Sequence, residues 1–210
     1  MRYSHLVFDI DGTLIDTNGP YLLAMQRLLL ERFGQEKSLD DLLCILGVPE
    51  RLTLKRFGFS DVEEAYAAVS RYFDEYSGGI RVFDGLEDTL AGLKALGYPM
   101  GLVTSKTRSA FDGEFSRLSI AAYFDASVCF DDTLLHKPDP APMLCYLSRT
   151  GADPSRTLYV GDSPYDMEMC RAAGVDCALA TWGVQRREEV PCTWRVEHPA
   201  QLLTLLCPEK

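Results

Sequence analysis

Acidic side chains follow two short apolar segments of this sequence, at positions from which they could act together. Asp9 and Asp11 come directly after residues 6–8, and Asp162 and Asp166 follow a later segment of the same kind. Carboxylates that meet at one place repel one another strongly, so a bound cation is needed to hold them together. Because all of these ligands are oxygen atoms, the pattern favours Mg²⁺ over zinc.

Hydroxyl groups and one lysine stand at comparable positions. Thr104 and Ser105 follow the apolar residues 100–103, and Lys137 lies in the loop after another expected strand. In open parallel sheets, ligands bind at the carboxyl ends of the strands. We therefore expect these polar side chains and the carboxylates to share one edge of a sheet.

The elements that must position these residues are short apolar strands that alternate with helices from residue 83 onward. Such repeated strand–helix units are typical of a parallel sheet covered by helices. Residues 17–82 instead show helical spacing with little strand character. The sequence thus predicts an α/β fold, a Rossmann-like parallel sheet sandwiched by helices, formed by residues 1–16 and 83–210 and interrupted by a helical insertion at 17–82. The clearest expected strands are residues 100–103, 127–130, 158–160 and 177–180. The clearest expected helices are residues 86–96, 108–118 and 165–173.

The composition is that of a globular chain of 210 residues, with 47 % hydrophobic and 25 % charged residues. The 31 acidic and 21 basic residues give a net charge of −10, which disfavours binding to nucleic acid and to anionic membranes. No segment approaches the ~18 consecutive apolar residues of a membrane helix, and the N-terminus lacks the apolar region of a signal peptide. We therefore expect a cytoplasmic protein. The sequence leaves its oligomeric state open, with a monomer and a dimer as the two alternatives.

The seven cysteines are an odd number without a CxxC spacing. This pattern argues against a zinc site and against a disulfide framework. It favours buried thiols in a reducing compartment.

Four segments resemble the motifs of the haloacid dehalogenase (HAD) phosphatase superfamily, in the same order and at similar spacing. The resemblance covers essentially the whole predicted sheet region and implies a HAD-like core. It also implies that residues 17–82 form a helical cap domain, inserted between the first and second motifs as in phosphoglycolate-phosphatase-like members. The four segments are Phe8-Asp9-Ile10-Asp11-Gly12-Thr13-Leu14, Val103-Thr104-Ser105, Lys137-Pro138-Asp139-Pro140 and Gly161-Asp162-Ser163-Pro164-Tyr165-Asp166.

The resemblance implies a role for each of the polar residues. Asp9 would be the nucleophile that attacks phosphorus and forms an aspartyl-phosphate. Asp11 would be the general acid and base, protonating the leaving oxygen and then deprotonating the attacking water. Thr104 and Ser105 would bind the substrate phosphate, and Lys137 would bind it and stabilise the developing charge.

The same resemblance implies a magnesium site. Asp9, Asp162 and the main-chain carbonyl of Asp11 would hold Mg²⁺, and Asp166 would support them from the outer shell. Each residue also has a structural interpretation. Asp11-Gly12 is a common turn signal, and the role of Asp162 or Ser163 could simply be to cap the following helix. A single lysine such as Lys137 is usually solvated. The four motifs together favour the catalytic interpretation.

The sequence favours one reaction within the superfamily and leaves others open. Asp11 favours phosphoryl chemistry over carbon–halogen cleavage, and the absence of a lysine after Gly47 disfavours phosphonate hydrolysis. The favoured function is a Mg²⁺-dependent phosphatase for a small phosphomonoester, resembling phosphoglycolate. A β-phosphoglucomutase-like sugar-phosphate mutase remains an alternative, because Arg51 lies near the position of a mutase arginine. An inorganic pyrophosphatase or nucleotidase of the same superfamily is a further alternative, because the Val-Thr-Ser-Lys and Lys-Pro-Asp-Pro segments also resemble small pyrophosphatases. We expect Arg51 to contribute to substrate specificity from the cap. The physiological substrate stays open.

Overall fold

The computed structural model describes residues 2–183 and 190–206 of the chain. It divides into two compact units. The sheet unit comprises Met1–Leu14 and Val82–Lys210, and the helical unit comprises Ile15–Arg81. The insertion interrupts the sheet unit at one point, because the Phe83 N–H donates a hydrogen bond to the Leu14 carbonyl at 3.2 Å.

Six parallel strands form the sheet in the order β5-β4-β1-β6-β7-β8. Each described pair of neighbours is parallel, and Phe8 at the end of β1 lies opposite Leu102 and Val160. The segments after β1, β4 and β6 therefore leave the sheet at the same edge. This arrangement confirms the predicted parallel α/β fold. The strands are β1 (His5–Phe8), β4 (Met100–Val103), β5 (Ala126–Val128), β6 (Thr157–Gly161), β7 (Asp176–Ala180) and β8 (Trp194–Val196).

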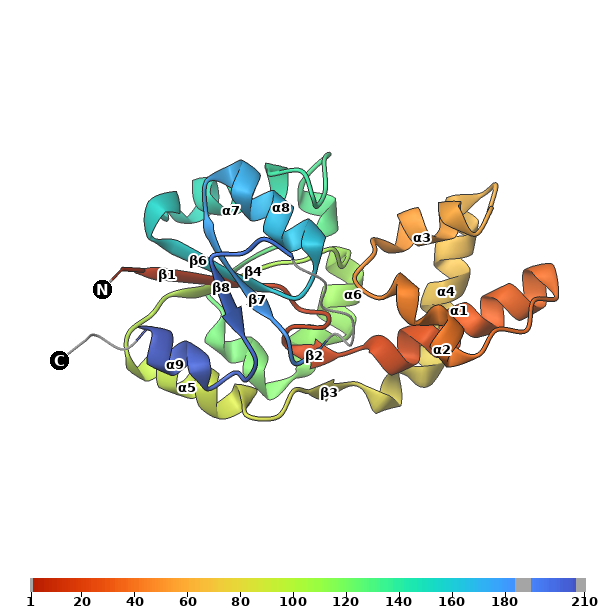
Figure 1. The fold of residues 1–210 in the computed structure, drawn as a ribbon, viewed down its shortest axis with the longest axis horizontal. Coiled ribbons are helices and arrows are strands. Elements are labelled where there is room, and N and C mark those ends of the chain that lie inside the picture. The colour runs from red at the N-terminus through yellow and green to blue at the C-terminus, as the bar shows by residue number, and fades with distance from the viewer. Residues whose placement is uncertain (1, 184–189, 207–210) are drawn as a thin grey trace. The chain divides into compact units, whose positions relative to one another are not determined.

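Helices cover both faces of this sheet (Figure 1). On one face, α7 (Ala141–Thr150) and α8 (Pro164–Ala173) bury an apolar cluster that includes Val7 and Tyr159. On the other face lie α5 (Leu86–Ala95) and α9 (Gln201–Leu206), which contact each other. A sheet buried on both faces explains why its strands are almost wholly apolar.

The helical unit has its own apolar core. Its helices are α1 (Asn18–Phe33), α2 (Leu39–Leu42), α3 (Glu50–Arg56) and α4 (Val62–Tyr76). The side chains that they bury together include Leu22, Met25, Leu28, Leu42, Leu54 and Val69. Two short strands, β2 (Ile15–Asp16) and β3 (Arg81–Val82), pair with each other at the two ends of the insertion.

The structure departs from the sequence-based expectation in three elements. The strand expected at 127–130 is β5 (Ala126–Val128), followed by a 3₁₀ turn at Phe130–Asp132. The helix expected at 108–118 is α6 (Arg108–Gly113), followed by a 3₁₀ turn at Phe115–Arg117. The strand β8 was not predicted, because its three residues are a mixed segment that becomes a strand only by pairing with β7. No helix in the described part of the chain is long and apolar enough to cross a membrane.

The cysteines of the described residues carry free thiols. They are Cys44, Cys129, Cys145, Cys170, Cys177 and Cys192, while Cys207 lies outside the described residues.

Candidate active site

The polar residues meet at the carboxyl edge of β1, where the order of the strands changes direction. The chain runs from β1 to β4 and β5 on one side, and later to β6, β7 and β8 on the other. Such a switch point leaves the loops after the two central strands apart from each other, so a ligand can enter between them. The candidate site therefore lies where the topology of a doubly wound sheet makes room for it.

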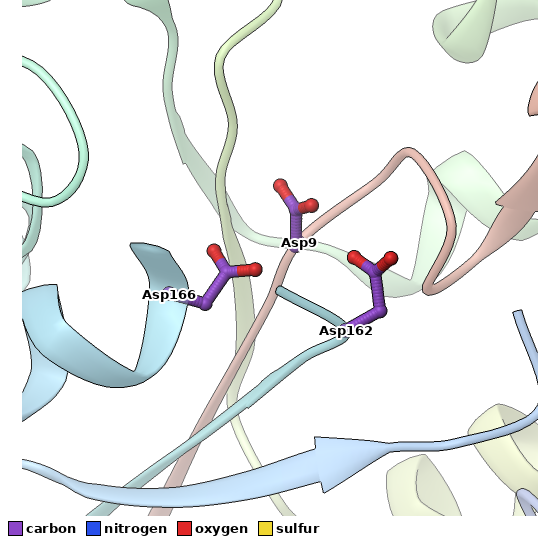
Figure 2. A group of neighbouring side chains, drawn as sticks. All are labelled: Asp9, Asp162 and Asp166. Carbon is purple, nitrogen blue, oxygen red and sulfur yellow. The ribbon is translucent and has the colours of Figure 1, made fainter. Parts of the chain in front are cut away.

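Three aspartates converge at this edge (Figure 2). Asp9 follows β1, Asp162 follows β6, and Asp166 lies in the first turn of α8. Each offers a carboxylate oxygen, and these atoms all lie within 4.8 Å of one another. In Figure 2 the three carboxylates point into a common space between the two strand ends.

Lys137 balances part of this negative charge. Its Nζ atom lies 2.8 Å from Asp9 Oδ1 and 2.7 Å from Asp166 Oδ1, and it donates a third hydrogen bond to Tyr159 Oη at 2.7 Å. The side chain is only 6 % exposed. Burial alone would lower the pKa of Lys137, but Asp166 and Asp9 raise it above its ordinary value, so the lysine stays charged.

Asp166 is held in place by the start of its own helix. Ser163 caps α8, and Asp166 completes a capping box with it. Asp166 Oδ2 accepts hydrogen bonds from Ser163 N and Oγ at 3.1 and 2.6 Å, while Oδ1 accepts from Tyr159 Oη at 3.0 Å and from Lys137. Although burial would raise the pKa of Asp166, Lys137 and these hydrogen bonds lower it.

Lys137 does not fully compensate the negative charge of the other two aspartates, Asp9 and Asp162. Burial, with Asp166 and Asp11, raises the pKa of Asp9 from 3.8 to about 7 even though Lys137 opposes the shift. Burial, with Asp166 and Asp9, also raises the pKa of Asp162 well above its ordinary value. A cation between Asp9 and Asp162 would relieve both effects, and carboxylate oxygens are the ligands that Mg²⁺ prefers. The donor set therefore fits a magnesium ion.

Asp11 and the hydroxyl residues lie on the β4 side of β1. Asp11 Oδ1 is 3.1 Å from Lys106 Nζ. Thr104 is buried, and its Oγ1 accepts a hydrogen bond from the Lys106 N–H at 3.1 Å, while Ser105 beside it is exposed.

The turn after β1 is packed tightly against two other segments. Gly12 has a φ of +74°, and a Cβ there would lie 2.7 Å from Asp162 Cγ. A Cβ at Gly183 would lie 2.8 Å from the Gly12 carbonyl carbon, and Trp182 Nε1 donates a hydrogen bond to Thr13 O at 2.8 Å. Glycine is needed at both positions because backbone and carboxylate approach each other closely.

Arg51 lies in the helical unit, at the start of α3. Its guanidinium donates to both carboxylate oxygens of Glu63 at 2.8 and 2.9 Å and lies 3.9 Å from the centre of the Tyr66 ring. These contacts fix the direction of the side chain within that unit.

Two residues of the site carried no predicted role. Tyr159 is buried in β6, and its hydroxyl group contacts Lys137 and Asp166. Lys106 contacts Asp11 and Glu114. The one signal for Tyr159 was a polar ring in an otherwise aliphatic strand, two residues before Gly161, and Lys106 was visible only as the residue after Ser105.

Comparison with known proteins gives matches over almost the whole chain. An N-acetylmuramic acid 6-phosphate phosphatase from Pseudomonas aeruginosa is 32 % identical over 219 residues, covering 98 % of this chain and 96 % of that protein. The pyrophosphatase PpaX from Bacillus velezensis is 33 % identical, covering 88 % of this chain and 86 % of that protein. A solved structure from Lactobacillus plantarum, assigned to the phosphoglycolate phosphatases, superposes with a TM-score of 0.91 at 26 % identity, covering 98 % of this chain and 100 % of that one.

The family match rests on the same region of the sequence as the site. Residues 6–180 match the family described as haloacid dehalogenase-like hydrolase, and this span contains all four motif segments. The predicted family and the predicted enzyme class are both confirmed. The chain belongs to the haloacid dehalogenase-like hydrolases.

Proposed function

We propose that this protein is a Mg²⁺-dependent phosphatase that hydrolyses a small phosphomonoester through an aspartyl-phosphate on Asp9. The observation that carries the proposal is the cluster of Asp9, Asp162 and Asp166 within 4.8 Å, with the Lys137 ammonium among the carboxylates. Catalysis of phosphoryl transfer consists almost entirely of positioning the nucleophile and neutralising charge. This cluster supplies both.

The first half of the reaction would use Asp9 and Asp11. An Asp9 carboxylate oxygen forms a bond to phosphorus while the bond from phosphorus to the leaving oxygen breaks. Asp11 gives its proton to that oxygen, which departs as an alcohol. In the second half, Asp11 takes a proton from water, the water oxygen bonds to phosphorus, and the bond to Asp9 breaks. Inorganic phosphate leaves, and both aspartates return to their starting states.

The remaining residues would bind the phosphoryl group and hold the cation. Thr104 and Ser105 donate hydrogen bonds to phosphoryl oxygens, and Lys137 reduces the repulsion between Asp9 and the phosphate. Asp9, Asp162 and the Asp11 carbonyl hold Mg²⁺. Asp166 acts from the outer shell, because Ser163, Lys137 and Tyr159 already use its oxygen atoms. When bound, the ion neutralises charge on the phosphoryl oxygens.

The decisive test combines a substrate panel with one substitution. With Mg²⁺ present, the wild-type protein is expected to release phosphate from a small phosphomonoester such as 2-phosphoglycolate or a sugar phosphate. Asp9→Asn keeps the size of the side chain but removes the nucleophile, so turnover is expected to vanish while the circular dichroism spectrum is unchanged. Retained turnover in Asp9→Asn would falsify the mechanism.

The panel also separates the alternatives that the relatives suggest. One relative is named as a pyrophosphatase and another as a sugar-acid phosphatase, so pyrophosphate, nucleotides and N-acetylmuramic acid 6-phosphate belong in it. A requirement for a bisphosphorylated sugar, with product isomerised rather than hydrolysed, would indicate a mutase instead. No turnover of any of these compounds would point to a binding protein.

Substrate choice is proposed to lie in the helical unit, acting as a cap, with Arg51 as one specificity residue. Glu63 and Tyr66 fix the Arg51 guanidinium, which makes it a directed cation rather than a flexible one. Arg51→Ala is expected to change the ratio of kcat/KM between substrates and to leave kcat on the best substrate similar. Glu63→Gln is the matched control, because it loosens Arg51 without removing the charge; equal ratios in all three proteins would exclude the role.

A further inference from the structure

The two aspartates of the first motif are held by different lysines. Asp9 Oδ1 lies 2.8 Å from Lys137 Nζ, which also lies 2.7 Å from Asp166 Oδ1. Asp11 Oδ1 lies 3.1 Å from Lys106 Nζ, and Lys106 follows β4. Lys137 also contacts the Tyr159 hydroxyl in β6, so each of the two carboxylates has its own cationic partner. Among the described residues, the group of carboxylates that could hold a metal ion contains Asp9 but not the Asp11 side chain.

Lys106 is itself fixed by a second carboxylate. Its side chain is 10 % exposed, and its Nζ lies 2.6 Å from Glu114 Oε2, at the C-terminal end of α6. Burial would lower the pKa of Lys106, but Asp11 and Glu114 raise it above its ordinary value. The Lys106 backbone N–H is also tied to Thr104 Oγ1. The ammonium group therefore has a fixed place between Asp11 and Glu114.

We propose that Lys106 is a positioning residue for Asp11 and that Glu114 fixes Lys106. This inference rests on the proposed function, in which Asp11 transfers the proton. The Asp11 side chain is 37 % exposed and would otherwise sample several rotamers. The contact between Lys106 and Oδ1 holds the carboxyl group in one orientation and leaves Oδ2 to carry the proton toward the leaving oxygen. Proton transfer is efficient only when the acid is within hydrogen-bond reach of its target.

Leaving-group dependence tests this role. A good leaving group such as p-nitrophenolate departs without a proton, whereas an alkoxide needs one. Loss of Lys106 should therefore slow the cleavage of alkyl phosphates much more than that of p-nitrophenyl phosphate. The quantity to compare is kcat/KM, because it reports the step in which the leaving group departs.

The variants are Lys106→Met, Lys106→Arg and Glu114→Gln, with Lys94→Met as control. Each is assayed with Mg²⁺ on p-nitrophenyl phosphate and on the alkyl phosphate that the wild type hydrolyses fastest. General acid catalysis contributes about 10²–10⁴-fold, so Lys106→Met is expected to lose at least ~10-fold more kcat/KM on the alkyl phosphate. Lys106→Arg should restore part of the loss, and Glu114→Gln should show the same preference more weakly. Lys94, an exposed partner of Asp125, should have no effect.

The possible results separate this inference from the proposed function. Equal losses on both substrates, or no loss on either, would overturn the positioning role while leaving the phosphatase intact. A wild-type protein that cleaves neither substrate nor any other phosphate ester would overturn the proposed function itself, and the role of Lys106 with it. If Lys106→Met does not fold, the losses of kcat/KM on the two substrates are compared in Glu114→Gln and Lys106→Arg instead. Equal losses on both substrates, or no loss on either, in these two variants would again overturn the positioning role.

Discussion

Lys137 Nζ lies 2.8 Å from Asp9 Oδ1, a contact between residues 128 positions apart in the sequence. The same ammonium contacts Asp166 and the Tyr159 hydroxyl, so its three N–H groups meet three acceptors. Two buried carboxylates share one buried cation, and the removal of any member leaves charge uncompensated. This relationship ties the stability of the sheet unit to the charge balance of its site.

Lys137→Met is therefore expected to damage both stability and activity. Breaking a buried ion pair from one side costs about 3–5 kcal/mol, which corresponds to a fall in Tm of roughly 6–20 °C for a chain of this size. Loss of a charge-stabilising group is expected to lower kcat by about 10²–10³-fold. Differential scanning fluorimetry and steady-state kinetics measure the two effects. A variant with wild-type Tm and kcat would show that Lys137 is not part of the charge balance.

Tyr159→Phe is expected to slow catalysis although Tyr159 never touches the substrate in the proposed mechanism. The change removes a hydroxyl that lies 2.7 Å from Lys137 Nζ, 3.0 Å from Asp166 Oδ1 and 3.0 Å from the Val103 carbonyl. Unpaired buried polar groups cost about 1–3 kcal/mol of stability, and Lys137 loses one of its three anchors.

Tyr146→Phe is the matched control for this variant. Tyr146 is equally buried, and its hydroxyl contacts His5 Nε2 at 2.7 Å at the amino end of β1, away from the site. It is expected to lower the free energy of unfolding while kcat stays the same. If the two variants lose kcat equally, the effect of Tyr159 is only structural.

Gly12→Ala is expected to abolish activity and to destabilise the protein. Its φ of +74° is costly for alanine, by about 1–2 kcal/mol, and the added Cβ would also displace the Asp162 carboxylate. Gly97 has a φ of +83° with open space around its Cβ position, so Gly97→Ala carries only the backbone cost. Active Gly12→Ala protein with a Tm equal to that of Gly97→Ala would contradict the close packing.

Removal of divalent metal should make stability fall as pH rises. The pKa of Asp9 is raised from 3.8 to about 7 in the folded, metal-free protein. Between these values the folded state binds more protons than the unfolded state, so the free energy of unfolding decreases from about pH 4 to about pH 7. Mg²⁺ competes with these protons and is expected to raise Tm more at pH 8 than at pH 5.

Thermal unfolding in EDTA and in Mg²⁺ at both pH values measures this difference. Asp9→Asn removes one titrating group and should flatten both the pH dependence and the response to Mg²⁺. A Tm that is insensitive to Mg²⁺ at pH 8 in the wild-type protein would argue against a metal site in this cluster.

The sequence was sufficient to predict the sheet and the convergence of the acidic residues. Apolar segments such as β1 and β6 must be buried, and the carboxyl ends of parallel strands share one edge, so Asp9 and Asp162 had to meet. The contacts of Tyr159 and Lys106 were not predictable in this way. They depend on strand register and on where a helix ends, which tertiary packing decides. Glu114, which contacts Lys106, stands at the C-terminal end of α6, where the sequence instead favours a helix that continues to residue 118.

The edge strand β8 is a second element that could not be predicted from the sequence. Trp194 and Val196 alternate with Arg195 over only three residues, too short a pattern to predict a strand. This segment becomes a strand by pairing with β7. Thr193 and Cys177 exchange hydrogen bonds at the start of that pairing.

The hydrogen bond between Phe83 N and Leu14 O means that the chain leaves the sheet unit and re-enters it at one place. A segment whose ends meet can be lengthened, shortened or exchanged without moving the strands on either side. Residues 15–81 can therefore be exchanged as a unit without altering Asp9, Lys137 or Asp162, which all lie outside that segment. Under the proposed function, such an exchange would alter the unit that selects the substrate and leave the reacting residues in place, so a laboratory graft at this junction is expected to change substrate preference at little risk to the fold.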